Sequence, residues 1–166
     1  MREMVLAPPR GGAELLVDRA GLTARRLGGL GQTLISGELD AAIATLAPGA
    51  PILGLDALAP AGAHVLRIGR TSALLVTPAP IAAADGWRGG WCATSVDDGF
   101  AAVELSGADA DQALMQATSA DLASGSPSAA VLVFGLRALV ARRRAGFRVH
   151  IEATRLETLI AWLDGV

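Results

Sequence analysis

The sequence predicts an α+β protein built from two pseudo-repeated, ferredoxin-like halves, in which helices pack on antiparallel sheets. Two apolar stripes with the spacing i, i+3, i+4, i+7 indicate amphipathic helices, and each follows a Ser-Gly pair, Ser36-Gly37 or Ser106-Gly107. After each helix, short strand-like runs are bounded by turn residues. The offset of about 70 residues suggests an internal duplication of strand–helix–strand–strand units. Chance likeness stays open as the alternative, because helices rich in Ala and Leu resemble one another.

The domain organisation follows from length and from the composition of the N-terminus. A chain of 166 residues is long enough for one well-buried core. We expect an extended N-terminal arm at 1–21 and a single domain at 22–166, whose two halves span about 22–90 and 91–166. Pro8-Pro9 and Gly11-Gly12 disfavour regular structure in the arm, where the apolar Leu15, Leu16 and Val17 either fray or bind a partner.

The first half begins with a strand expected at 22–36, which Gly28, Gly29 and Gly31 weaken. A helix follows and ends at Pro48-Gly49, and its apolar stripe is Leu39, Ala42, Ile43 and Leu46. The pattern then predicts, in order, a loop at 51–60, strands at 63–68 and 72–77, a short helix at 81–84 and a glycine-rich loop at 86–90.

The second half is predicted to open with a hairpin turn at Asp97-Asp98-Gly99, because Asp-Gly is a strong hairpin signal. A strand at 100–105 and a helix from about residue 108 follow, and the stripe of that helix is Ala110, Ala113, Leu114 and Ala117. Three strands are expected at 130–133, 136–141 and 147–152. The last helix has a capping-box pattern in Thr154 and Glu157 and an apolar face of Leu156, Leu159, Ile160 and Leu163.

Composition narrows the class of function. The net charge of −2, from 14 basic and 16 acidic residues, gives no field that favours nucleic acid. No apolar run reaches the roughly 18 to 20 residues of a membrane helix, so we expect no membrane segment. One cysteine cannot form an internal disulfide, and the N-terminus lacks a signal-peptide pattern, so the cytoplasm is the expected compartment. The 52% hydrophobic content then indicates a large core together with a partner surface.

Candidate catalytic residues are few. His64 and His150 lie in predicted strands with apolar neighbours, without metal-ligand spacing, so a structural role is expected for both. Cys92 is interpreted as a small buried hydrophobe, since no cation run beside it would lower the thiol pKa. The glycines at 28–31 lack the remaining residues of a nucleotide-binding loop. We therefore predict no catalytic residue and no metal site.

Two groups of residues are open to more than one interpretation. Trp87 and Trp91 flank a glycine-rich loop, where tryptophan either anchors an interface or packs in the core. Arg142, Arg143 and Arg144 at a predicted hairpin tip either form a solvated turn or bind a phosphate or a folate glutamate tail.

A family resemblance rests on five segments of this sequence, which are Ser95-Val96-Asp97-Asp98-Gly99, Val103-Glu104-Leu105-Ser106-Gly107, Ala120-Asp121-Leu122, Phe147-Arg148-Val149-His150-Ile151 and Trp162-Leu163. In order and spacing the chain resembles the gamma subunit of heterotetrameric sarcosine oxidase and, more distantly, the folate-binding domain of glycine-cleavage aminomethyltransferases. The resemblance covers roughly Leu22 to Leu163. The short loop after Asp121-Leu122 departs from it, because it lacks the family's Pro-rich, Cys-containing run.

The resemblance implies a small, non-catalytic subunit of a complex that oxidatively demethylates sarcosine to glycine and passes the one-carbon unit to tetrahydrofolate. It implies no cofactor on this chain, with FAD, FMN, NAD and tetrahydrofolate on larger flavin-binding partner subunits. Self-association of the isolated chain is expected for the same reason. The alternative is a freestanding folate-binding or aminomethyltransferase-like protein, for which Asp121 is the one residue that corresponds to a family acid.

Overall fold

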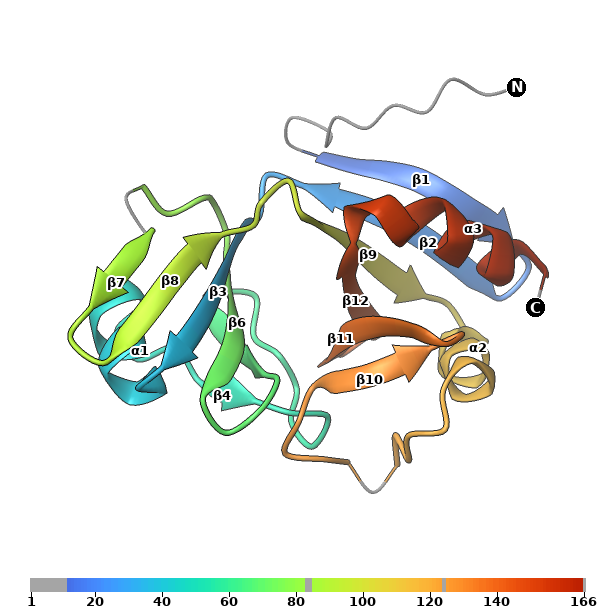
Figure 1. Ribbon diagram of the computed structural model, residues 1–166. Helices are drawn as coiled ribbons and strands as arrows, with labels where there is room; N and C mark the ends of the chain where they lie inside the picture. The colour runs from blue at the N-terminus through green and yellow to red at the C-terminus, as the bar shows by residue number, and fades with distance from the viewer. Residues whose placement is uncertain (1–11, 83–84, 124, 166) are drawn as a thin grey trace.

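The computed structural model describes residues 12–82, 85–123 and 125–165, which form two six-stranded sheets and three α-helices (Figure 1). The first sheet has the strand order β1 (Gly12–Arg19), β2 (Leu22–Gly28), β9 (Phe100–Ser106), β12 (Gly146–Glu152), β11 (Leu136–Arg143) and β10 (Ala130–Val133). The second sheet has the order β7 (Gly86–Arg88), β8 (Trp91–Ser95), β3 (Gly31–Gly37), β6 (Ser72–Thr77), β5 (His64–Arg67) and β4 (Ile52–Leu53). All neighbours are antiparallel except β4 and β5, so the predicted α+β class is confirmed.

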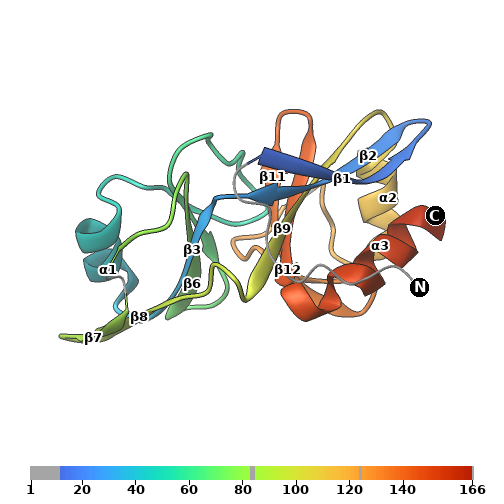
Figure 2. The ribbon, with the colours of Figure 1, turned by 90° about the horizontal axis from the view of Figure 1, so that it is seen from above.

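The helices lie on the outer faces of the two sheets, and the inner faces look toward each other (Figure 2). α1 (Leu39–Leu46) covers the second sheet, while α2 (Ala110–Ala117) and α3 (Leu156–Gly165) cover the first. The predicted stripes are the buried faces: all four stripe residues of α2 are buried, and so are Leu39, Ala42 and Ile43 of α1. Helical periodicity therefore located both helices correctly.

Each sheet combines a hairpin with a unit of one strand, a helix and three further strands, β1–β2 with β9 to β12 in the first sheet and β7–β8 with β3 to β6 in the second. The hairpin β1–β2 precedes β3 in sequence but pairs with β9, and the hairpin β7–β8 precedes β9 but pairs with β3. The chain thus crosses from one sheet to the other twice, after β2 and after β8 (Figure 1). As a result, the first sheet joins two separate stretches of sequence, 12–28 and 100–152, whereas all strands of the second sheet lie within the single stretch 31–95.

Two glycines fix the junction between each hairpin and the neighbouring unit. Gly37 has φ +105 and Gly107 has φ +112, a conformation that favours glycine. A Cβ on Gly37 would lie 2.2 Å from the carbonyl oxygen of Gly90, and one on Gly107 would lie 2.3 Å from that of Gly21. Each of these carbonyls also accepts a backbone hydrogen bond, from Glu38 at 3.0 Å and from Asp109 at 2.8 Å respectively. The Ser-Gly pairs are therefore equivalent points of close backbone approach.

The crossings correct two predictions. The strand expected at 22–36 is two strands in different sheets, because the chain leaves the first sheet at Gly28 and passes through Gly29, at φ +78, before β3 begins. The turn at Asp97-Asp98-Gly99 is not a hairpin, since it joins β8 of the second sheet to β9 of the first. Within the turn, the backbone N–H groups of Gly99 and Phe100 donate to the carbonyl of Val96, so the local turn chemistry does not depend on whether the turn closes a hairpin.

The boundaries of the predicted arm and halves also fall differently. Residues 1–11 of the arm lie outside the described residues, and residues 12–19 form β1, which pairs with β2. The boundary expected at 90/91 passes between β7 and β8, which are hydrogen-bonded neighbours, and the loop expected at 86–90 includes β7. The short helix expected at 81–84 lies partly outside the described residues. Thr154 lies inside a 3-10 turn, Ala153–Arg155, rather than at the cap of α3, so its capping box is not formed.

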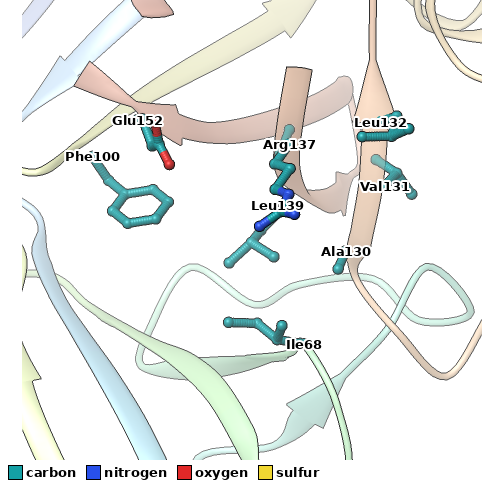
Figure 3. A pocket seen from close by; sticks show the side chains of 9 residues that line it. Ile68, Phe100, Ala130, Val131, Leu132, Arg137, Leu139 and Glu152 are labelled. Atoms are coloured by element: carbon teal, nitrogen blue, oxygen red, sulfur yellow. The ribbon is translucent and has the colours of Figure 1, made fainter. Parts of the chain in front are cut away.

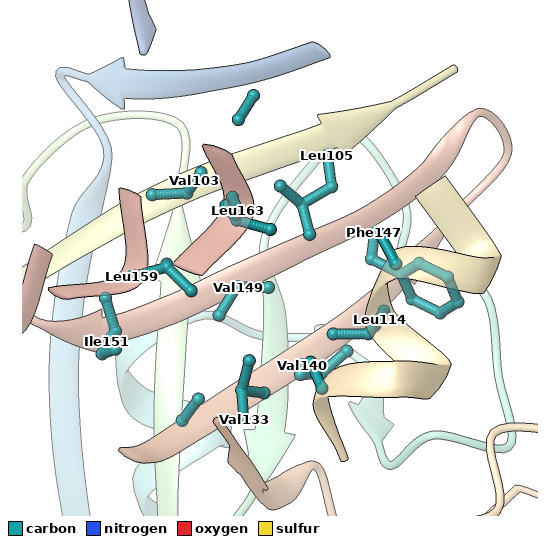
Figure 4. Close-up of a cluster of buried hydrophobic side chains, with 14 of the residues drawn as sticks. Val103, Leu105, Leu114, Val133, Val140, Phe147, Val149, Ile151, Leu159 and Leu163 are labelled. Carbon is teal, nitrogen blue, oxygen red and sulfur yellow. The ribbon is translucent and has the colours of Figure 1, made fainter. Parts of the chain in front are cut away.

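The hydrophobic core has three parts. The largest lies between the first sheet and its two helices, where side chains such as Val103, Phe147 and Leu159 interdigitate (Figure 4). A second lies between α1 and the second sheet and includes Trp91. The third joins the inner faces of the two sheets, from Leu66 and Leu74 on one side to Leu139 and Ala141 on the other. The space between the sheets is therefore a packed layer, and the polar groups described next are embedded in it.

Candidate functional site

Asp121, the one family acid carried over from the resemblance, has a local structural role. It is exposed, and its Oδ1 accepts a hydrogen bond from the backbone N–H of Ala123 at 2.9 Å, which closes a turn after α2. A hollow of about 110 Å³ lies beside the turn, lined in part by Leu122 and Ala123. This volume is below the roughly 300 to 1,000 Å³ typical of small-molecule sites. The hollow beside this turn is therefore too small to hold a pterin.

Two of the three consecutive arginines are tied to backbone carbonyls rather than being solvated. The guanidinium of Arg142 donates to the carbonyls of Leu122 and Leu55 and lies 5.4 Å from the ring centre of Phe147. Arg143 donates through Nη1 to the carbonyl oxygens of Ala59 at 2.9 Å and Pro60 at 2.6 Å. Only Arg144 is exposed at the turn. The expected solvated turn is wrong for Arg142 and Arg143, which fasten the 53–60 loop to the end of β11.

The candidate interface residues divide between surface and core. Trp87 on β7 is 72% exposed, and Leu15 on β1 is 48% exposed, so both stay candidates for a partner contact. Leu16 is half-buried against the core of the first sheet. Val17 and Trp91 are each 4% exposed and pack in the cores of the first and second sheets, which corrects their assignment to an interface. A tryptophan at a strand end beside α1 fills the core instead of reaching outward.

A polar network crosses the layer between the sheets and centres on Gln32 of β3. The backbone N–H of Gln32 donates to Oδ1 of Asp97 at 2.5 Å, and its Nε2 donates to the carbonyl of Phe100 at 2.9 Å. Its Oε1 lies 2.6 Å from Nδ1 of His150 on β12. Because this oxygen only accepts, Nδ1 of His150 carries the proton and donates. The network ties together both crossings of the chain, which explains why the acids before Gly99 are structural.

His150 and His64 are both buried and neutral in this layer. Burial, with smaller contributions from the nearby Arg148 and His64, lowers the pKa of His150 to about 3. Burial also lowers the pKa of His64, against the opposing effect of its hydrogen bond to the carbonyl of Gly62 at 2.8 Å. Neither ring is accessible, with 0% and 1% exposure. A structural role, as predicted from the sequence, accounts for both rings without a catalytic one.

An ion pair joins Arg148 of β12 to Glu104 of β9, at 3.0 Å. Within the part of the chain that the structure describes, no three His, Cys, Asp or Glu side chains gather closely enough to hold a metal ion. Cys92 is half-buried, and its Sγ lies 3.7 Å from the carbonyl of Ala93. Among the described residues, no side-chain hydrogen bond joins a serine, threonine or cysteine to a histidine. The geometry thus provides no activated nucleophile in the described ranges.

A cavity of about 500 Å³ lies at the open end of the layer between the sheets. Arg137 and Leu139 of β11 point into it, with Phe100 and Glu152 on one side, β10 on the other and Ile68 of the opposite sheet below (Figure 3). Neither Arg137 nor Glu152 was predicted from the sequence to belong to a site. A charged residue within the apolar run LRALVA is the one local signal that could have drawn attention to Arg137. The lining comes from segments up to 84 residues apart, from Ile68 to Glu152, so the cavity itself has no signature in the sequence.

The fold is similar to that of a solved chain. A chain of the heterotetrameric sarcosine oxidase from Corynebacterium sp. U-96, solved in complex with pyrrole 2-carboxylate, matches with a TM-score of 0.73. The match covers 90% of this chain and 85% of the other, at 18% sequence identity. No protein-family model and no curated protein sequence matches this chain. The resemblance identified from the sequence is thus confirmed as a likeness of fold over nearly the whole chain.

One further observation concerns membranes. In the described ranges, no helix has the length and apolar character needed to cross a bilayer.

Proposed function

We propose that this chain is a non-catalytic, gamma-type subunit of a cytoplasmic sarcosine oxidase complex. The observation that carries the proposal is the fold match over 90% of this chain and 85% of a chain of a heterotetrameric sarcosine oxidase. Because both lengths are nearly covered, the likeness concerns an entire subunit and not a common motif. The order of segments around Asp97, Ser106 and Phe147 in the sequence supports the same assignment.

The chemistry of the described residues supports a structural role. The two histidines are buried and neutral, and Asp121 and two of the three arginines are engaged by the backbone. We therefore assign the oxidative demethylation of sarcosine to glycine, with transfer of the one-carbon unit to tetrahydrofolate, to partner chains. On this proposal FAD, FMN, NAD and tetrahydrofolate are bound by larger flavin-binding subunits, and this chain has none of them.

The partner surface is proposed to include the hairpin β7–β8. All three residues of β7 are exposed, and Trp87 presents 72% of its surface to solvent. Tryptophan at the centre of an interface is a common source of binding energy. An outer strand with free backbone groups also favours association, so the isolated chain should self-associate.

A duplication of two ferredoxin-like units is proposed as the origin of this fold. In both sheets the strand before the helix pairs with the last strand of the unit, as β3 with β6 and β9 with β12. The equivalent close approaches of Gly37 and Gly107, with similar positive φ values, support the same interpretation.

The test is to purify the tagged chain from its native cells and analyse what it carries. The proposal expects a stoichiometric assembly with larger chains, flavin absorbance and sarcosine-dependent peroxide formation, while the chain alone turns over no sarcosine. A chain that stays monomeric, carries no flavin protein and gains thermal stability with tetrahydrofolate would instead establish the freestanding folate-binding alternative.

A further inference from the structure

We propose that the 500 Å³ cavity between the sheets is a binding site for a small zwitterion with an apolar body, such as an amino acid with a large hydrophobic side chain. The inference concerns the isolated chain and does not depend on the proposed function. It rests on the shape of the cavity, on its apolar walls and on two unpaired charges of opposite sign.

The cavity has the size and position of a ligand site. Its volume of about 500 Å³ lies within the roughly 300 to 1,000 Å³ typical of small-molecule pockets, which often form where two layers or domains meet. Leu139, which is 6% exposed, lies on the face of β11 that looks toward the second sheet, and Ile68 lies across from it (Figure 3). Phe100 and Leu132 complete the apolar walls. These surfaces would accept an aliphatic or aromatic side chain.

A single row of side chains crosses four strands at the mouth of the cavity. Leu132 of β10 pairs with Arg137 of β11, and Glu152 of β12 pairs with Phe100 of β9. The register between β11 and β12, in which Ala138 faces Ile151, places Arg137 and Glu152 next to each other in the same row. The row therefore reads apolar, cation, anion, apolar, and all four side chains line the cavity.

The two charged groups are available to a ligand. Opposite charges on neighbouring strands ordinarily attract each other. Yet in the described residues the ion pair joins Arg148 to Glu104, and the side chains of Arg137 and Glu152 form neither an ion pair nor a hydrogen bond. A carboxylate would bind the guanidinium of Arg137, and a protonated amine would bind the carboxylate of Glu152. A molecule with both groups on one carbon satisfies both charges at once.

This pattern favours a zwitterion over the other simple ligand classes. A plain anion with an apolar tail would be attracted by Arg137 but repelled by Glu152. A protonated amine with an apolar tail would be attracted by Glu152 but repelled by Arg137. An uncharged molecule would leave both charges without a partner. The apolar body is required because the walls away from the charged row are hydrophobic.

The experiment is an NMR titration of the ¹⁵N-labelled full chain with four probes. L-phenylalanine should bind with a dissociation constant on the order of 1 mM, as expected for a ligand of this size. Its shift changes should map to Ile68, Phe100 and residues 130–132. 3-Phenylpropanoate, which lacks the amine, and 2-phenylethylamine, which lacks the carboxylate, should each bind roughly threefold to fivefold more weakly, as expected for one solvent-exposed charge contact. Glycine, which lacks the apolar body, should give no saturable shift.

Variants connect the binding to the two charges. Arg137→Gln should weaken the binding of L-phenylalanine by roughly threefold to fivefold but should not weaken the binding of 2-phenylethylamine. Glu152→Gln should weaken the binding of L-phenylalanine by the same factor but should not weaken the binding of 3-phenylpropanoate. Arg70→Gln on the β5–β6 turn and Glu157→Gln on α3 are matched controls outside the cavity and should change nothing. Ala130→Phe, at an exposed position on the rim, should block all binding while the thermal midpoint stays close to that of the parent chain.

Three results would overturn the proposal. One is the absence of saturable shifts with L-phenylalanine at the highest soluble concentration. Another is binding that neither charge variant nor Ala130→Phe alters. The third is a loss of subunit assembly on Ala130→Phe without any amino-acid binding, which would assign the cavity to a protein partner.

Discussion

Two hairpins occupy the same position in the two sheets, and only one of them has a helix packed against its outer strand. β1–β2 lies at the edge of the first sheet, where α3 contacts β1 and Val17 is buried. β7–β8 lies at the corresponding edge of the second sheet, where no described helix takes the place of α3 and Trp87 is exposed. The comparison indicates that the second sheet is the incomplete one. The exposed outer strand of its hairpin, β7, is the surface on which a partner would complete it.

The hairpin β7–β8 itself combines a core residue and a surface residue of the same type. Trp91→Ala removes a side chain that is 4% exposed and packs in the core of the second sheet, so it should lower the free energy of unfolding by about 3 to 5 kcal/mol. Urea denaturation of the isolated chain measures this loss. A loss below about 1 kcal/mol would mean that Trp91 is not part of the core.

The equivalence of the two hairpin junctions predicts equal effects for Gly37→Ala and Gly107→Ala. Each new Cβ would lie within 2.3 Å of a backbone carbonyl oxygen at a positive φ, so each variant should lose about 3 kcal/mol or more. Gly49→Ala is the matched control, because Gly49 has φ +80 and open space around it, and it should lose only about 1 kcal/mol. Markedly unequal losses of unfolding free energy in the two variants would show that the two junctions are not equivalent.

The layer between the sheets should make the protein acid-sensitive. The pKa of His150 is lowered to about 3 by burial, whereas it is near 6.5 in the unfolded chain, so between these values the unfolded state binds a proton that the folded state does not. Stability is therefore fully present above pH 6.5 and falls as the pH drops toward 3. The loss between pH 7 and pH 5 should be about 2 kcal/mol from this residue. His64, whose pKa is also lowered, adds in the same direction.

Urea denaturation at pH 7 and pH 5 measures this loss, and His150→Gln serves as the comparison because glutamine keeps a hydrogen-bond donor near Gln32. The variant should show a flatter pH dependence. Equal stability of the parent chain at both pH values would show that His150 titrates normally and is not held neutral.

The smallest expected effect on the chain itself is that of Trp87→Ala. Because Trp87 is 72% exposed, its removal should change the free energy of unfolding by less than about 0.5 kcal/mol. It should nevertheless weaken self-association and assembly with partner chains, measured by analytical ultracentrifugation. Met115→Ala, which removes a 61% exposed side chain from α2 of the other sheet, is the matched control. Equal effects of both variants on assembly would show that β7–β8 is no special surface.

Local patterns predicted the helices and most strands of this protein, but not how the strands assemble. The stripes of α1 and α2 depend on side chains within one turn of each other, so they are visible in sequence. The pairing of the hairpin β1–β2 with β9 joins residues about 80 positions apart in the chain, such as Arg25 and Glu104. A pairing over this distance leaves no local signal in the sequence. The turn Asp97-Asp98-Gly99 is compatible both with a hairpin and with a connection between two sheets, so its residues do not distinguish the two.

The candidate site, like the assembly of the strands, was only partly predictable from the sequence. Burial of His64 and His150 followed from their apolar neighbours. The roles of Arg142 and Arg143 did not, because all their carbonyl partners except Leu122 lie in a loop more than 80 residues earlier. The cavity needs four neighbouring strands of one sheet and a turn of the other, so only the assembled fold places Arg137 beside Glu152.

The most direct test of the central claim, that this chain supports chemistry done by its partners, is an add-back measurement of sarcosine-dependent peroxide formation. Cells that lack the chain should lose the activity, and the unaltered chain should restore it. Asp121→Ala should restore it to within a few-fold, because Asp121 is exposed and its carboxylate helps close a turn. Full activity without the chain, or a loss of several orders of magnitude with Asp121→Ala in an intact assembly, would contradict the claim.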